Sequence, residues 1–291
     1  MRKREKQRKQ NGGMAKRVMV LLLLAVFLFS LYRVLHILRG YRTAQAVYDK
    51  AAQTYMLPVE RMDEDAQAED VPPQIDFEGL RAVNRDVIGW IFIEGTDVNY
   101  PLLVGADNQQ YLFQSYMKKY AVAGSIFLDY RCSRNLSDYH TVIYGHNMKN
   151  GMMFGELDAY QKADYLAAHP YVYILMADGS WNKYRIFAYA QVSVESAVYD
   201  LPCDTKQKIK ALRAQLAQSS GYAAGEAAAA DAADGALQGA AQGSEAKLLT
   251  LSTCTNDSRD DVRFAVHCVL EEGCLKRSRT VKIQLKFCKQ L

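Results

Sequence analysis

Residues 18–38 (VMVLLLLAVFLFSLYRVLHIL) form a mostly apolar run that restricts the fold more than any other segment. As a helix rising about 1.5 Å per residue, this run would extend roughly 31 Å, close to the hydrocarbon thickness of a bilayer. Arg33 and His36 lie near its C-terminal end, where such side chains can reach the headgroups. We therefore predict a transmembrane helix over 18–38.

A dense basic segment precedes this run. Residues 1–17 hold eight of the 36 Lys and Arg residues and a single acid, Glu5. Because basic flanks stay in the cytoplasm, we expect 1–17 to be a cytoplasmic tail and the rest of the chain to face outward from the cell membrane. Acids outnumber basic residues in that remainder, so the net charge of +4 does not call for a nucleic-acid partner.

A cleaved signal peptide is the alternative to a retained anchor. Ala44-Gln45-Ala46 resembles the small-x-small pattern at which signal peptides are cleaved. The apolar run is long for a signal peptide, however, and Arg39 and Arg42 intervene. The retained, single-pass anchor is therefore favoured.

The remainder of the chain divides into a stalk over 39–75 and a folded domain over 76–291. The stalk is expected to begin with a helix over 41–56 and to end at Pro72-Pro73. In the domain, a short helix through Val83 precedes many short β-rich runs that predict a barrel or sandwich. Strands are expected at 87–95, 98–103, 124–130, 140–145, 171–176, 183–192, 247–254, 262–270 and 280–287, and helices at 108–117, 155–167 and 205–218.

Residues 219–246 differ in composition from the rest of the domain. This segment is rich in Ala and Gly and has almost no large apolar side chains. Such a stretch cannot bury enough surface to order itself. We interpret it as a flexible insertion before the strand at 247–254, with a functional lid as the alternative.

Cys254 is the first candidate for catalysis. It ends the strand 247–254 on the face that also carries Thr250 and Ser252, and a strand end allows the partial exposure that a reactive thiol needs. Taken alone, this segment favours a buried structural cysteine over a reactive nucleophile.

Two further residues strengthen the interpretation of Cys254 as a nucleophile. His146 follows Gly145 at the end of a strand, so its imidazole could meet Cys254 on one rim of a barrel. His267 is the other histidine in a plausible site setting, but it lies about 13 Å along its strand from Arg263. Arg263 opens the strand after Cys254, where it could stabilise a thiolate or an oxyanion. A surface Arg263 paired with neighbouring acids is the alternative.

These segments together resemble the class B sortases. The resemblance rests on TLSTC at 250–254, an Arg at the start of the next strand, and YGHNMKNGMMF at 144–154. It extends over residues 76–291 and includes GWIFIEGTDVNYPLL, DNQQYL and GSIFLDY. The fold implied is mainly β with peripheral helices, a closed eight-stranded sortase barrel.

The resemblance also implies the activity and the site. A sortase cleaves a C-terminal sorting signal after its Thr and joins that Thr to an amine of a cell-wall precursor or a pilin. By position, Cys254 resembles the nucleophile, His146 the proton shuttle and Arg263 the oxyanion group. The implied substrate-binding residues are Asn108, Leu112, Tyr144 and Ser252. No cofactor is expected. The partners would be secreted proteins with a sorting motif and the amine acceptor.

Two function classes remain as alternatives. A papain-like cysteine hydrolase, without amine transfer, would carry its nucleophile on a helix and before the His, which does not match this order. A catalytically idle binding domain is supported only by the unusual insertion.

Six cysteines are present without zinc-type spacing, so no metal site is expected. Cys268 and Cys274 could bridge a hairpin, although free buried thiols are the simpler expectation.

Overall fold

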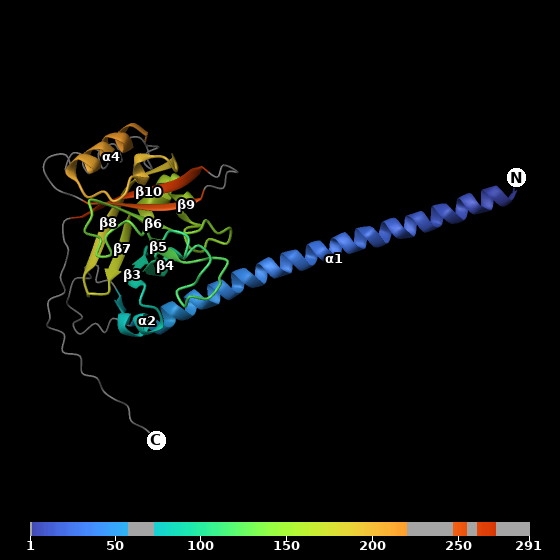
Figure 1. Ribbon diagram of the computed structural model, residues 1–291, viewed down its shortest axis with the longest axis horizontal. Coiled ribbons are helices and arrows are strands. Elements are labelled where there is room, and N and C mark those ends of the chain that lie inside the picture. Colours follow the sequence, from blue (N-terminus) through green and yellow to red (C-terminus); the bar gives the residue numbers. More distant parts are fainter. Residues whose placement is uncertain (1, 58–72, 220–246, 255–260, 272–291) are drawn as a thin grey trace, which may run out of the picture. The chain divides into compact units, whose positions relative to one another are not determined.

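The computed structural model describes residues 2–57, 73–219, 247–254 and 261–271 (Figure 1). Contacts divide the chain into two units, 1–46 and 47–291. Helix α1 (Arg2–Tyr55) accounts for the first unit. Its part from Lys16 to Tyr55 contains an 18-residue stretch with a mean hydropathy of 2.6, and it is long and apolar enough to cross a membrane. A signal sequence would share these properties, so the choice between anchor and signal peptide stays a prediction.

The second unit is built around a closed barrel of eight strands in the order β10-β8-β7-β3-β4-β5-β6-β9, which confirms the predicted fold class (Figure 1). Nearly all residues of β3, β4 and β7 are buried on both faces, because loops and short helices cover the outside of the barrel. The strands are β3 (Val87–Phe92), β4 (Asn99–Val104), β5 (Ile126–Leu128), β6 (His140–Tyr144), β7 (Tyr171–Met176), β8 (Trp181–Ser193), β9 (Leu248–Cys254) and β10 (Val262–Leu270).

Three of the four helices predicted in the domain are present in the structure. Helix α2 (Phe77–Val83) starts at Asp76, whose carboxylate accepts the N–H of Gly79 at 2.9 Å. The helix expected at 155–167 is present as two pieces, and that at 205–218 as one. These are η1 (Leu157–Gln161), α3 (Ala163–Ala168) and α4 (Lys206–Ser219); a further short turn, η2 (Ala197–Tyr199), follows β8.

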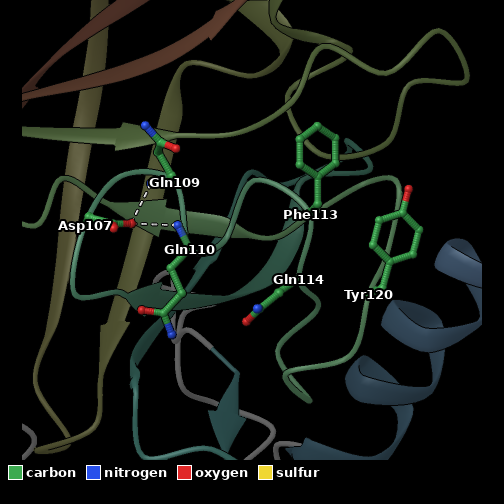
Figure 2. A pocket seen from close by; sticks show the side chains of 6 residues that line it. All are labelled: Asp107, Gln109, Gln110, Phe113, Gln114 and Tyr120. Atoms are coloured by element: carbon green, nitrogen blue, oxygen red, sulfur yellow. Dashed lines mark hydrogen bonds between the residues drawn. The ribbon is translucent and has the colours of Figure 1, made fainter.

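The helix expected at 108–117 is absent, and this prediction is wrong. Asp107 Oδ1 accepts the N–H groups of Gln109 and Gln110 at 2.9 and 2.8 Å, as Figure 2 shows. Such contacts also cap the start of a helix, but here they cap a single turn, in which Leu112 N donates to Gln109 O at 3.1 Å. The chain then folds back on itself, with Ser115 N donating to Lys119 O at 2.8 Å.

The residues expected to form a stalk are partly packed on the barrel unit. Tyr48, near the end of α1, donates its hydroxyl to the Gly124 carbonyl. After α1, the short strands β1 (Met56–Leu57) and β2 (Gln74–Ile75) pair antiparallel. The domain boundary at 76 stays a prediction, and the expected strand at 280–287 and most of the 219–246 insertion lie outside the described residues.

Candidate active site

Three adjacent strand ends bring the predicted catalytic residues to one edge of the barrel. Strands β6 and β9 are parallel, with Tyr144 opposite Ser252, and Gly145 N donates to Ser252 O at 3.2 Å. Continuing this register by two residues brings His146 to the level of Cys254. On the other side of β9, the antiparallel strand β10 places Arg263 directly opposite Cys254. Since neighbouring strands lie about 5 Å apart, the backbone alone sets Cys254 between His146 and Arg263.

Gly145 is needed here for space. A Cβ at this position would collide with the side chains of Ile126 and Phe154. The backbone of Gly145 is not in the left-handed region, so conformational freedom is not what selects glycine at this position. Glycine therefore lets the backbone before His146 pass close to the side chains of Ile126 and Phe154.

The imidazole of His146 is held by the loop between β4 and β5. Its Nε2 lies 2.6 Å from the carbonyl oxygen of Leu112, and a carbonyl can only accept. Nε2 therefore carries the proton in the neutral ring, which leaves Nδ1 as the nitrogen with a free lone pair. The ring of Phe113 packs against the imidazole at 5.4 Å between centroids.

A cavity of about 420 Å³ opens at this edge. All six predicted site residues other than Cys254 line it, and Thr253, the residue before Cys254, lines it as well. The lining residues are Asn108, Leu112, Phe127, Arg131, Tyr144, Gly145, His146, Val194, Tyr199, Ser252, Thr253 and Arg263. Its volume suits a small ligand or a few residues of a peptide.

Comparison with known proteins identifies the family. The sortase domain matches residues 91–271, which is more than half of the chain. The chain belongs to the sortase family. Sortase B of Listeria monocytogenes is 37% identical to this sortase over 152 residues, which are 52% of this chain and 60% of the relative. Sortase B of Staphylococcus aureus is 30% identical over 169 residues, 58% of this chain and 65% of the relative.

The matches thus span less than two thirds of the length of these curated relatives. Among solved structures, a class B sortase of Streptococcus pyogenes involved in pilus biogenesis is 28% identical, with a TM-score of 0.55. That comparison covers 67% of this sortase and 98% of the other chain. The solved structure of sortase B from Listeria monocytogenes is 30% identical, with a TM-score of 0.53, over 66% of this sortase and 99% of the other chain. This match confirms the predicted membership of class B.

Asp129 organises the cavity of this sortase and was not predicted from the sequence. Its carboxylate is fully buried and accepts hydrogen bonds from Asn108 Nδ2 at 2.8 Å, the Tyr144 hydroxyl at 2.9 Å and Arg131 at 2.8 and 2.9 Å. Burial alone would raise the pKa of Asp129, but these donors outweigh it and hold the pKa below its usual value. The only signal available was an acid near the end of the strand predicted at 124–130, two residues before Arg131.

Ser252 also has a partner that sequence analysis missed. Its hydroxyl lies 2.8 Å from that of Tyr199, which comes from the turn η2 after β8. The Tyr199 ring stacks on Tyr144 with 6.3 Å between centroids. The two tyrosines therefore form one wall of the cavity, although 55 positions separate them in the sequence.

His267 does not belong to the cavity. It lies fully buried beside the Thr250 hydroxyl, with Nδ1 at 2.9 Å, and His140 Nε2 reaches the same oxygen at 2.8 Å. Burial lowers the pKa of His140 to about 3 and of His267 to about 4. Both imidazoles are therefore neutral at pH 7 and serve the core.

The cysteines other than Cys254 that the structure describes are poor nucleophiles. Cys132, Cys203 and Cys268 are free and buried. Burial raises the pKa of Cys203 to about 11 and of Cys132 to about 12, and it raises that of Cys268 further. Thiols with such pKa values carry almost no thiolate at pH 7. Cys274, the predicted partner of a possible Cys268 bridge, lies outside the described residues.

Among the described residues, there is no cluster of three or more His, Cys, Asp or Glu side chains that could coordinate a metal ion. The groups available at the edge of the barrel are an imidazole, two guanidinium groups and hydroxyls. Such groups suit acyl transfer from a cysteine.

Proposed function

We propose that this sortase is a cysteine transpeptidase that cleaves a C-terminal sorting signal after its Thr and transfers the acyl group to an amine of a cell-wall precursor. The observation that carries the proposal is the register of β6, β9 and β10. Arg263 pairs with Cys254, and Tyr144, two residues before His146, pairs with Ser252. A cavity lined by the predicted substrate-binding residues at the same edge supports the proposal.

In the first half of the reaction, the Cys254 thiolate attacks the carbonyl carbon of the Thr. Arg263 stabilises the negative charge that develops on the carbonyl oxygen. The C–N bond then breaks, and protonated His146 gives its proton from Nδ1 to the departing amine. The products are a thioester on Cys254 and the free C-terminal fragment.

In the second half, the acceptor amine attacks the thioester carbonyl. Neutral His146 takes a proton from the attacking nitrogen, the C–S bond breaks, and the thiolate forms again. The new amide bond replaces the old one, so the reaction needs neither an oxidant nor ATP. The enzyme returns to its starting protonation state.

The proposed location follows from the first 38 residues. The basic tail over 1–17 and the apolar helix support a single-pass anchor with the catalytic domain outside. Secreted proteins that bear a sorting motif would then meet the cavity as they emerge. Protease added to intact cells should remove the domain, and a protected domain would contradict this orientation.

The decisive experiment offers purified enzyme a library of sorting peptides with a panel of amines. We expect peptide cleavage after Thr, an amide-linked product, and loss of both in Cys254→Ala but not in Cys268→Ala. Release of free carboxylate at every amine concentration would instead indicate a cysteine hydrolase. Ligation to a pilin lysine alone would favour a role like that of the Streptococcus pyogenes relative. Absence of any Cys254-dependent product would refute the proposal.

A further inference from the structure

A second hollow, of about 500 Å³, lies on the loop between β4 and β5 (Figure 2). It is distinct from the cavity described above, since the two share no lining residue. The hollow is lined by Asp107, Gln109, Gln110, Phe113, Gln114 and Tyr120. No role for it follows from the cleavage of the sorting signal, because the residues assigned to that step line the other cavity.

Consecutive residues beside His146 line the cavity and the hollow. Leu112 lines the cavity and holds the imidazole through its carbonyl oxygen. Phe113, the next residue, lines the hollow and packs its ring against the same imidazole. The Phe113 ring therefore belongs to the wall of the hollow and also contacts His146. A ligand in the hollow would contact the ring that packs on the imidazole.

Two exposed aromatic rings form the apolar side of the hollow. The side chains of Phe113 and Tyr120 are 51% and 78% exposed. They stand on the two arms of one turn, which is held by the bond from Ala121 N to Phe113 O at 3.0 Å and by the bridge between Gln114 and Tyr120. Large aromatic side chains left in water on an ordered turn are typical of a binding surface.

The polar side of the hollow suits a peptide that carries an amine. Gln109, Gln110 and Gln114 offer amide donors and acceptors, and Figure 2 shows Asp107 beside the first two. The six lining residues include one acid and no basic residue. An ammonium group on the approaching peptide would therefore meet a neutral to negative surface.

We propose that this hollow is the acceptor site, which binds a short amine-bearing peptide and delivers its amine past His146 to the thioester. The inference rests on the proposed function, because only a transpeptidase needs a second substrate at the thioester. It adds a binding site and a substrate class: the peptide part of the acceptor packs against the rings of Phe113 and Tyr120. The alternative occupant is the C-terminal fragment of the sorting signal.

The test measures the two half-reactions separately with the full-length enzyme. Release of the C-terminal fragment reports thioester formation, and ligation to triglycine or methylamine reports the second half. For Tyr120→Ala and Gln114→Ala, the triglycine concentration for half-maximal ligation should rise about threefold to tenfold. Fragment release should be unchanged. Ligation of methylamine should also be unchanged, because this amine is too small to reach the rings. Tyr120 is the cleaner position, since Phe113 also contacts His146.

Tyr130→Ala is the matched control, because Tyr130 is 49% exposed and lies outside the hollow. It should leave the triglycine dependence unchanged. An unchanged triglycine dependence in Tyr120→Ala and Gln114→Ala would overturn the inference, as would ligation to a folded pilin domain but not to triglycine. Slower fragment release in these variants, with the triglycine dependence intact, would assign the hollow to the sorting signal instead. Wild-type enzyme that releases no fragment would refute the proposed function itself.

Discussion

Arg263 occupies a backbone position that pairing on both sides holds in place. It lies opposite Cys254 in β9 and opposite Val192 in β8, so its guanidinium group starts from a fixed point. A donor held at a developing oxyanion contributes about 3–4 kcal/mol. We therefore expect Arg263→Ala to slow thioester formation by about 10²- to 10³-fold, and Arg263→Lys to recover little because an ammonium lacks the planar fork.

Single-turnover release of the C-terminal fragment measures this loss. The control is Arg185→Ala, which removes a partly exposed arginine paired with Glu271 at 3.3 Å. Its rate should stay within about threefold of wild type, as for a screened surface charge. Equal losses in the two variants would show that Arg263 acts through the fold and not at the carbonyl.

Asp129 should affect substrate binding and stability without touching the reacting atoms. Asp129→Asn keeps the shape but removes the charge that holds Arg131, Asn108 and Tyr144 around the cavity. Since Arg131 is one-third exposed, we expect a stability loss of at most about 3 kcal/mol. The KM for the sorting peptide should rise more than kcat falls.

Tyr144→Phe is the matched comparison for Asp129, because it removes one of these hydrogen bonds and keeps the ring. Its cost should be about 1 kcal/mol, measured by urea unfolding. A kcat effect in Asp129→Asn with an unchanged KM would contradict a positioning role.

At the scale of elements, the end of β6 determines where His146 lies. Gly145→Ala would force the Cβ into Ile126 and Phe154, so the strand end must move away from the core. We expect a stability loss of about 1–3 kcal/mol, as in other overpacked sites, and at least about a tenfold loss of activity.

Gly179→Ala separates the two effects. Gly179 lies in the turn between β7 and β8 with φ +84°, and a Cβ there would meet nothing within 4 Å. The substitution should therefore cost stability through backbone strain, while activity per folded molecule stays unchanged. Thermal unfolding and single-turnover rates on both variants test this contrast. Equal activity losses in the two would mean that Gly145 matters only for folding.

The strands of the barrel could be predicted because their sequences show β-branched runs between Gly and Asp residues. The pairing of Arg263 with Cys254 followed from the length of the polar segment between them. The helix predicted after β4 was wrong because Asp107 makes contacts typical of a helix start, whereas the chain turns back through the bond from Ser115 N to Lys119 O. Tyr199 and Asp129 were missed because Ser252, Tyr144 and Asn108, which they contact, are distant in the sequence, and only the closed barrel brings them together.

At the scale of the whole molecule, two buried histidines make stability depend on pH. His140 and His267 stay neutral in the folded state because burial lowers the pKa to about 3 and about 4, whereas an unfolded histidine titrates near 6.5. Above pH 6.5 both states are neutral at these positions. Below it only the unfolded chain takes up protons, so stability should fall with a slope approaching about 2.7 kcal/mol per pH unit.

Urea unfolding at several pH values between 7.5 and 5 measures this slope. His267→Gln removes one of the two groups and should reduce the slope by about half. If the variant and the wild type lose stability equally as the pH falls, other groups are responsible. Should His267→Gln fail to fold, the wild-type slope alone still decides whether two protons are taken up on unfolding.

Each of the eight described barrel strands has a hydrogen-bonded neighbour on both sides. An open sheet would offer unpaired N–H and C=O groups, to which any extended chain could add as a further strand. The proposed substrates are extended segments of newly secreted proteins, which are well suited to such addition. A barrel without a free edge does not capture them through their backbones. Closure of the barrel thus removes one route by which this sortase could coaggregate with its proposed substrates.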